Sequence, residues 1–463
     1  MSSICTSNVT SGFIDLATFD EIEKYLYGGS DATAYFVRET RKSTWFTMVP
    51  VVLTKSTGSP DFNQQWSVSI SRAGDYLLHT WLRLTTPEIT LLAGNSVTTG
   101  GGVGSLRWTR NFMHNLISEC CITFNDLVAA RFDNYHLDFW SAFTVPAGKR
   151  NGYNNMIGNF DDMTGPHLVG VALEAFTLNL PLPFFYSRDS GVALPTAALP
   201  YNDMRIQFQF RNWSELLILE DSTGDDNTRV VPVVGTDITG TPTLGTTNVW
   251  GNYAIVSNDE RKRMACAPRD ILIEQVQTAP RQTFAPATNP TPTYDIRFSH
   301  AIKCLFFSVR NTTFGAEWSN YTAASPQPDG AAINFTPTNA TDPILQTSLI
   351  YENSTRLGNM GSDYFSLVNP WYHAPVIPLD TGYHMYSYSL DFICLDPLGS
   401  TNYGKLTNVS IVPQASTGAI SGAAGAQASG TGQVQAQTYE FVVTAIDNNI
   451  IRVSGGALGF PVL

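Results

Sequence analysis

Two Asp-Ser/Thr-Gly triplets are the residues of this sequence whose type and spacing could do chemistry. The first is Asp189-Ser190-Gly191 and the second is Asp380-Thr381-Gly382, so that one triplet lies in each half of the chain. Aspartic proteases hold two such carboxylates about 3 Å apart, where they share one proton. Hydrolysis of a peptide bond is therefore the first chemistry to consider.

The residues around the triplets do not suit a protease. A catalytic Asp of this kind follows a buried apolar strand, whereas Asp189 follows Tyr-Ser-Arg and Asp380 follows Pro-Leu. A neighbouring Arg188 would hold Asp189 ionised and exposed. Because Asp-Ser/Thr-Gly is also a common turn sequence, we interpret both triplets as turns, and an aspartic protease acting through Asp189 and Asp380 is the weakest of three functional hypotheses.

Other reactive patterns are missing from the sequence. The seven His residues show no HxH or HxxxH spacing, the six Cys residues form no CxxC motif, and no GxSxG elbow occurs. The glycine-rich segment 98–106 is followed by no Lys-Ser/Thr, so it predicts a hairpin tip and not a phosphate-binding loop. We therefore predict no catalytic, cofactor-binding or metal-binding residues.

Composition restricts the possible partners. Charged residues make up only 14% of the chain and the net charge is −12, so the basic surface that nucleic-acid binding requires is not expected. A surface this poor in charge is either neutral and polar or buried against partners. The first residues have no basic and apolar signal pattern, and no apolar run is long enough to cross a membrane. Free thiols in a reducing compartment are expected.

Alternating patterns predict a chain built mainly from strands. In 203–210, apolar Met, Ile and Phe alternate with Asp, Arg and Gln, which is typical of a half-buried strand. In 118–125 the same pattern places Cys120 on the apolar face and Cys121 on the polar face, where Cys121 could contact another molecule. Segment 301–309 is apolar on both faces and should be deeply buried. Tyr386, Tyr388, Leu390 and Phe392 are predicted to share one face, and 439–446 is the last clear strand.

The order of segments predicts two β modules after a short arm. A helix capped by Thr18 and Glu21 should end at Gly28. Segments 121–140 and 348–368 repeat the order strand, polar turn, short aromatic helix-like piece. We predict an arm with a short capped helix over 1–44, a first module over 45–213 and a second over 214–463. A jelly-roll carbohydrate-binding protein is the alternative hypothesis, although such a protein needs only one module.

Three ordered segments resemble a known family. They are RDSGVALPTAALPYNDMRIQFQF (188–210), VWGNYAIVSNDERKRMACAPRDILIEQVQ (249–277) and LDPLGSTNYGKLTNVSI (395–411). Together they resemble the major capsid proteins of nucleocytoplasmic large DNA viruses. The segment SGFIDLATFDEIEKYLYGG and the ending GALGFPVL are similar to the iridovirus branch. The family pattern Asn-Phe-Ser-Arg is replaced here by Asn402-Tyr403-Gly404-Lys405.

This resemblance implies an all-β fold of two tandem eight-stranded jelly rolls, a double jelly roll with long loops and a few short helices. It also implies a homotrimer of pseudo-hexagonal outline that makes trimer–trimer contacts in the icosahedral shell of a large double-stranded DNA virus. The expected partners are other copies of the chain, minor capsid proteins and proteins of an inner membrane. The expected location is the virion, assembled in the host cytoplasm. Loops 221–248 and 411–439 are the candidates for the outer surface.

Overall fold

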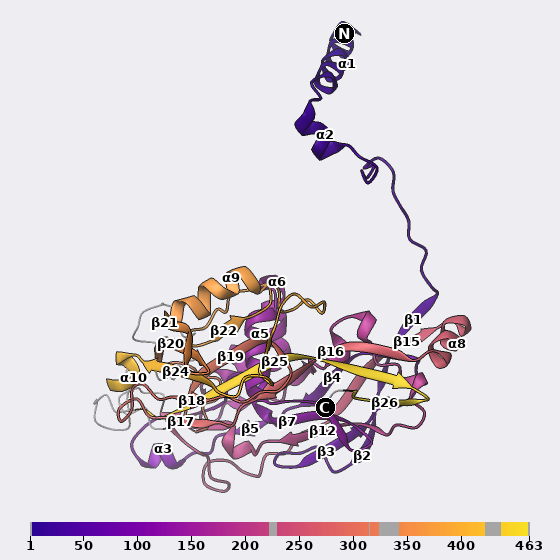
Figure 1. Ribbon diagram of the computed structural model, residues 1–463. Helices are drawn as coiled ribbons and strands as arrows, with labels where there is room; N and C mark the ends of the chain where they lie inside the picture. The colour runs from indigo at the N-terminus through magenta and orange to yellow at the C-terminus, as the bar shows by residue number, and fades with distance from the viewer. Residues whose placement is uncertain (1, 222–228, 314, 324–341, 422–436, 462–463) are drawn as a thin grey trace. The chain divides into compact units, whose positions relative to one another are not determined.

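The computed structural model describes residues 2–221, 229–313, 315–323, 342–421 and 437–461. It divides into two units, Met1–Trp45 and Phe46–Leu463 (Figure 1). The first unit contains helices α1 (Ser2–Ala17) and α2 (Glu21–Tyr27). Asp20 and Glu23 form the capping box of α2, so the predicted cap at Thr18 was wrong. The Thr18 hydroxyl instead donates to the carbonyl of Asp15, 2.7 Å away, at the end of α1.

The second unit begins with a lobe of eight principal strands arranged as a jelly roll. One sheet has the order β1-β15-β4-β11, which is first, eighth, third and sixth along the chain. The other contains β3-β12-β7-β8, which is second, seventh, fourth and fifth, with the short β2 (Thr54–Thr57) added at its edge. In chain order the eight strands are β1 (Phe46–Val52), β3 (Gln65–Ser69), β4 (Tyr76–Thr85), β7 (Ile117–Phe124), β8 (Leu127–Phe132), β11 (Thr177–Pro181), β12 (Met204–Phe210) and β15 (Asn248–Val256).

A second lobe repeats this strand order. Its sheets are β16-β25-β19-β22 and β18-β24-β20-β21, again first-eighth-third-sixth and second-seventh-fourth-fifth. The repeat predicted from segments 121–140 and 348–368 corresponds to the fourth strand, the fifth strand and the helical segment after them in each lobe. The strands are β16 (Arg269–Thr278), β18 (Tyr294–Asp295), β19 (Ala301–Asn311), β20 (Ile344–Tyr351), β21 (Ser354–Gly361), β22 (His384–Ser387), β24 (Val409–Ala415) and β25 (Tyr439–Ser454).

The boundary predicted between residues 213 and 214 does not coincide with the change from one lobe to the other. Strand β13 (Leu217–Asp221) pairs with β6 (Gly104–Trp108), and β15 pairs with β1 and β4. All of these strands belong to the first lobe. The change of sheets follows β15, where helix α8 (Asn258–Cys266) leads to β16. The prediction assigned the closing strand to the second module because a long insertion, 211–247, separates it from β12.

Strand β19 explains why the core extends through both lobes. All of its residues after Ala301 are buried, as the apolar pattern of 301–309 predicted. Cys304 and Phe306 pack into a core shared with the first lobe, whereas Leu305 and Phe307 pack into the interior of the second lobe. The sheet that contains β19 is therefore covered on both faces.

Other local predictions were confirmed or corrected. Buried and half-buried residues alternate along β12 as expected. Segment 98–106 is not a hairpin tip, because helix α3 (Ser96–Thr99) leads through a turn into β6. Strand β22 stops at Ser387, and Leu390 is 70% exposed, so it does not share the buried face of Phe392. The middles of the two predicted outer loops, 222–228 and 422–436, lie outside the described residues.

Candidate functional site

The two Asp triplets have separate structural roles. Asp189 lies on an exposed turn and accepts a hydrogen bond from the backbone N–H of Ser190 at 2.8 Å. Asp380 instead pairs with the Arg110 guanidinium at 3.4 Å. Because each carboxylate interacts with a different group, the pair does not form the proton-sharing dyad of an aspartic protease. Within the described ranges, no group of three or more His, Cys, Asp or Glu side chains could hold a metal ion.

The sequence predicted that Arg188 would act on its neighbour Asp189, but its side chain has other partners. Its guanidinium lies 3.8 Å from the centroid of the Trp140 ring and pairs with Glu274 of β16. Glu274 also binds the ammonium of Lys303, which is 0% exposed and donates to the carbonyl of Cys394 at 2.5 Å. This ion-pair cluster therefore joins the region of the 3₁₀ helix η1 (Phe185–Ser187) in the first lobe to a sheet of the second.

Cys121 is buried, contrary to the expectation that it could be exposed. Its side chain is 7% exposed, and its sulfur lies 3.7 Å from the amide oxygen of Gln207 on the neighbouring strand. Cys120 is fully buried as predicted. Burial raises the pKa of both thiols, so neither is a reactive nucleophile.

Helix α5 (Asn134–Thr144) carries the central polar contact between the lobes. Its sequence, NYHLDFWSAFT, has apolar residues on every side, which is typical of a buried helix. Asp138 on this helix accepts hydrogen bonds from His114 at 2.8 Å, from the Ser319 hydroxyl at 2.8 Å and from the Tyr321 hydroxyl at 2.7 Å. Since Ser319 and Tyr321 follow β19, a single carboxylate connects the two lobes.

A second set of contacts surrounds Trp318, which also follows β19. Arg211 from the first lobe and Arg310 from the second lie 3.8 Å and 3.5 Å from its ring centroid. The indole N–H donates to the carbonyl of Glu215 at 2.9 Å. Cation–π contacts of this kind contribute more when they are removed from water, and burial lowers the pKa of Arg211.

Arg107 of β6 forms a third contact. Its Nε lies 2.7 Å from Glu220 of β13 and its Nη2 lies 2.6 Å from Glu317 near Trp318. Burial alone would lower the pKa of Arg107, but the charges of Glu317 and Glu220 outweigh burial, and the pKa is raised. The guanidinium therefore stays charged inside the protein.

These contacts hold the two lobes in one orientation and provide no reaction centre. A Tyr–His–Asp chain could relay a proton in an open cleft, and Tyr153, His114 and Asp138 form one, with the Tyr153 hydroxyl 2.6 Å from His114 Nε2. However, His114 and Asp138 are 0% and 1% exposed, so a substrate does not reach them. Buried polar networks of this kind fix a geometry, because each group left without its partner costs several kcal/mol.

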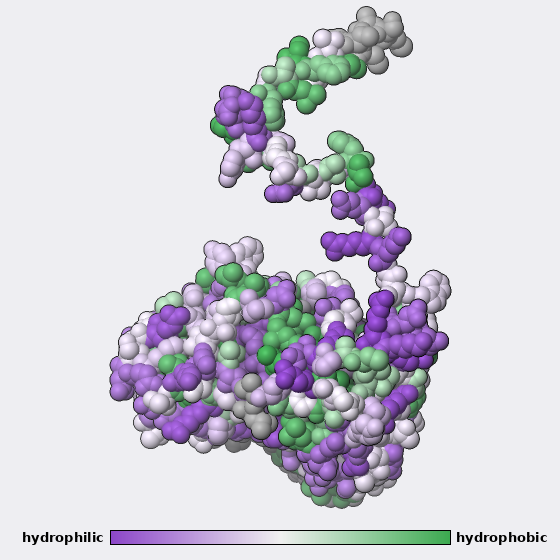
Figure 2. Space-filling model, turned by 45° about the vertical axis from the view of Figure 1, so that its right-hand side comes forward, coloured by the Kyte–Doolittle hydropathy of each residue, from purple (hydrophilic) through white to green (hydrophobic). Residues whose placement is uncertain are grey.

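The exterior of the second unit carries apolar side chains at several places. Trp371 and Tyr372, on α9 (Asn369–His373), are 70% and 73% exposed, and Leu390 is 70% exposed. His373 Nδ1 lies 3.0 Å from the carbonyl of Leu390, so these residues belong to one surface region. Figure 2 shows apolar groups gathered in patches among polar ones on the visible face. A contiguous apolar patch of this kind is a candidate surface for protein–protein contact.

Sequence reasoning did not find the contacts between the lobes. The aromatic character of α5 was visible, but its partners Ser319 and Tyr321 are 181 and 183 residues away in the chain from Asp138. No local pattern connects residues so far apart. Among the described residues, no helix is both long and apolar enough to cross a membrane.

Comparisons with known proteins agree with this architecture. Two family profiles match the chain: "Major capsid protein N-terminus" over residues 34–256 and "Large eukaryotic DNA virus major capsid protein" over residues 260–459. The major capsid protein of Costelytra zealandica iridescent virus is 66% identical over 472 residues, covering 100% of both chains. That of Invertebrate iridescent virus 6 is 65% identical over 469 residues, with the same coverage. The solved PBCV-1 virus capsid has the same fold, at 19% identity and a TM-score of 0.71 over 93% of this chain and 100% of that one.

Proposed function

The chain belongs to the major capsid proteins of large eukaryotic DNA viruses, and from this premise we propose that it builds the shell as a homotrimer. As a member of this family it is a structural protein of the virion capsid and not an enzyme. Its relatives in iridescent viruses match it over their full length. The finer assembly, with three copies in a ring and rings in an icosahedral lattice, is our proposal.

The observation that supports the proposed trimer is the repeated strand order of the two lobes. Three chains of two similar lobes form a ring with six similar edges, and such a ring can tile a surface with hexagonal packing. The network around Asp138 supports this role, because it keeps the two lobes of one chain at a constant angle. The exposed aromatic side chains of α9 suit contacts between copies.

The mass of the purified protein in solution tests the trimer. We expect sedimentation and light scattering to give three times the chain mass of 50.7 kDa at micromolar concentration. A monomer or dimer under these conditions would overturn the proposal. A monomer that also binds glycans on an array would favour the jelly-roll carbohydrate-binding alternative.

We also propose that the arm, Met1–Trp45, binds other shell components, either minor capsid proteins or proteins of an inner membrane. It carries exposed apolar side chains: Phe13 is 68%, Leu26 is 64% and Phe36 is 104% exposed. Helix α2 has no buried residue. Assembly in the host cytoplasm agrees with the free thiols among the described residues. The net charge of −12 argues against direct contact with the genome.

A further inference from the structure

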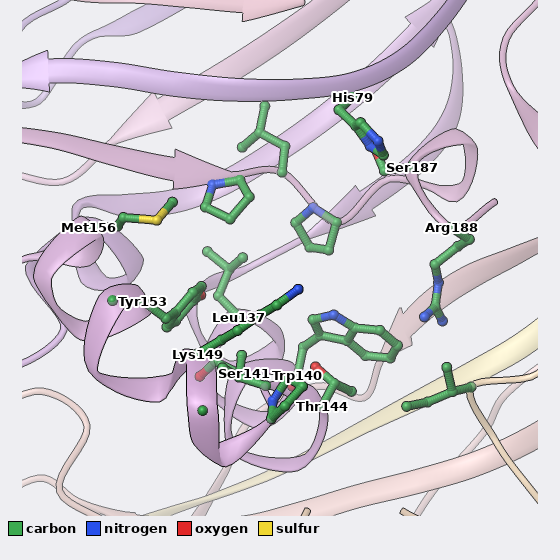
Figure 3. Close-up of a pocket in the computed structure, with 18 residues that line it drawn as sticks. His79, Leu137, Trp140, Ser141, Thr144, Lys149, Tyr153, Met156, Ser187 and Arg188 are labelled. Carbon is green, nitrogen blue, oxygen red and sulfur yellow. Dashed lines mark hydrogen bonds between the residues drawn. The ribbon is translucent and has the colours of Figure 1, made fainter. Parts of the chain in front are cut away.

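A pocket of about 660 Å³ lies mainly in the first lobe. One of its lining residues, Tyr153, also bonds to His114 of the buried network around Asp138. Helices α5 and α6 (Ala147–Ile157) form one side, and the chain from β11 to η1 (Phe185–Ser187) forms the other. Its apolar lining includes Leu137, Trp140, Met156, Leu182 and Ile393. Figure 3 shows these elements around the opening, with the Lys149 side chain extended among them. The volume is in the range of sites that bind small molecules.

The charged residues that line this pocket are all basic. Its charged lining residues are Lys149 and Arg188, and none of the residues that line it is acidic, although acidic residues outnumber basic ones in the chain by 39 to 27. Arg188 is already paired with Glu274. Lys149 is exposed, and no interaction joins its ammonium to an acidic side chain in the described part of the chain. The pocket thus combines an apolar interior with one available cation.

We propose that this pocket binds a long-chain monocarboxylate, such as a fatty acid, with the acyl chain against Trp140 and the carboxylate on Lys149. The apolar lining favours the methylene chain, and the single free ammonium favours one negative head group over a neutral or cationic one. A segment of a second copy is the competing occupant, and it would exclude the ligand from the assembled protein.

Titration calorimetry with octanoate, decanoate and dodecanoate tests the proposal on the purified, assembled protein. Each buried methylene is expected to raise the affinity about threefold to fourfold. Dodecanol and a dodecyl trimethylammonium salt serve as neutral and cationic probes and should bind at least about fivefold more weakly than dodecanoate. Equal binding of dodecanol and dodecanoate would overturn the proposed head-group site.

Two variants locate the binding. Gly152 lines the pocket within α6, and a Cβ added there meets no atom within 4 Å, so Gly152→Leu should fill the pocket without disturbing the helix. We expect it to abolish dodecanoate binding, whereas Gly12→Leu, at an equally open glycine of α1, should leave binding unchanged. Lys149→Gln should weaken binding about fivefold, while Lys262→Gln on α8 should not.

These binding experiments can fail independently of the proposed trimer. Unchanged dodecanoate affinity in Gly152→Leu would overturn the pocket assignment. No binding to the wild-type trimer would also overturn it. In both cases the mass in solution, which tests the trimer, is measured independently.

Discussion

Asp447 lies within β25 with its carboxylate completely buried. Neither carboxylate oxygen has a hydrogen bond of good geometry from the described residues. Burial raises the pKa of Asp447 to about 7, and the nearby Gln277 amide only partly offsets this effect. Leaving an ionised carboxylate in such a place costs free energy, so this residue should make the stability of the protein depend on pH.

The direction of this pH dependence follows from the pKa values of Asp447 in the unfolded and the folded chain. Below the ordinary value of 3.8 both states are protonated. Between that value and about 7 the unfolded chain loses the proton while the folded chain keeps it, so the free energy of unfolding falls as the pH rises. Above about 7 both states are ionised, and the loss stays constant at about 2–4 kcal/mol.

We predict that Asp447→Asn removes this decrease in the free energy of unfolding with rising pH, because an amide does not ionise. Urea unfolding at fixed protein concentration, at several pH values between 4 and 8, checks the prediction. Asp270→Asn is the control, because its pKa is lowered by the hydrogen bond from Arg452, and its replacement should not stabilise the protein at neutral pH. A wild-type pH slope in Asp447→Asn would contradict the assignment.

At the scale of elements, strands could be predicted wherever one face is buried and the other is exposed to solvent. β12 shows this pattern along its whole length, because one face packs in the lobe while the other remains half-exposed. Helix α5 was visible as an aromatic segment. The places where a predicted strand or hairpin is interrupted were not predictable. The bend after Ser387 and the turn into β6 depend on the residues that pack around them, and a periodic sequence pattern does not reveal that packing.

Helix α5 should stabilise both lobes through its aromatic residues. The Phe139 ring is fully buried, and its centroid lies 5.9 Å from that of Phe306 on β19 and 6.0 Å from that of Tyr383. Phe139→Ala should therefore lower the free energy of unfolding by about 3–5 kcal/mol. Hydrogen exchange should become faster in both α5 and β19.

The matched control is Phe284→Ala, a fully buried ring in the interior of the second lobe that packs on Tyr439. A similar loss of stability is expected, but without faster exchange in α5. If Phe139→Ala changed exchange only within the first lobe, the helix would not couple the two lobes.

At the scale of the whole molecule, the resemblance of ordered segments predicted the double jelly roll, while patterning alone predicted only two β modules. The limit between the lobes was misplaced because the strand that closes the first jelly roll, β15, comes after the long insertion of residues 211–247. A boundary read from loops cannot show that the chain later returns to the same sheet. Strand pairing across the lobe shows it directly.

The proposed role of the arm makes a prediction at this scale. Deleting residues 2–12 removes most of α1 and leaves the second unit intact. We expect an unchanged trimer mass in solution but fewer closed shells when the variant replaces the wild-type protein during infection, counted by electron microscopy. Replacing Phe13 and Ile14 by Ser should have the same effect through loss of apolar contacts alone. Normal numbers of closed particles would refute the role.

The covalent joining of two lobes with one strand order has a geometric consequence. In the proposed ring of three chains the sides would alternate between two kinds, so that a turn of 120° would reproduce the outline and a turn of 60° would exchange unlike sides. Each such ring would therefore have an orientation in the lattice, and adjacent rings would have to match it wherever their borders distinguish the two kinds of side. Under this proposal one polypeptide encodes both a nearly sixfold outline and a direction within it, and every ring contains the two kinds of side in equal numbers.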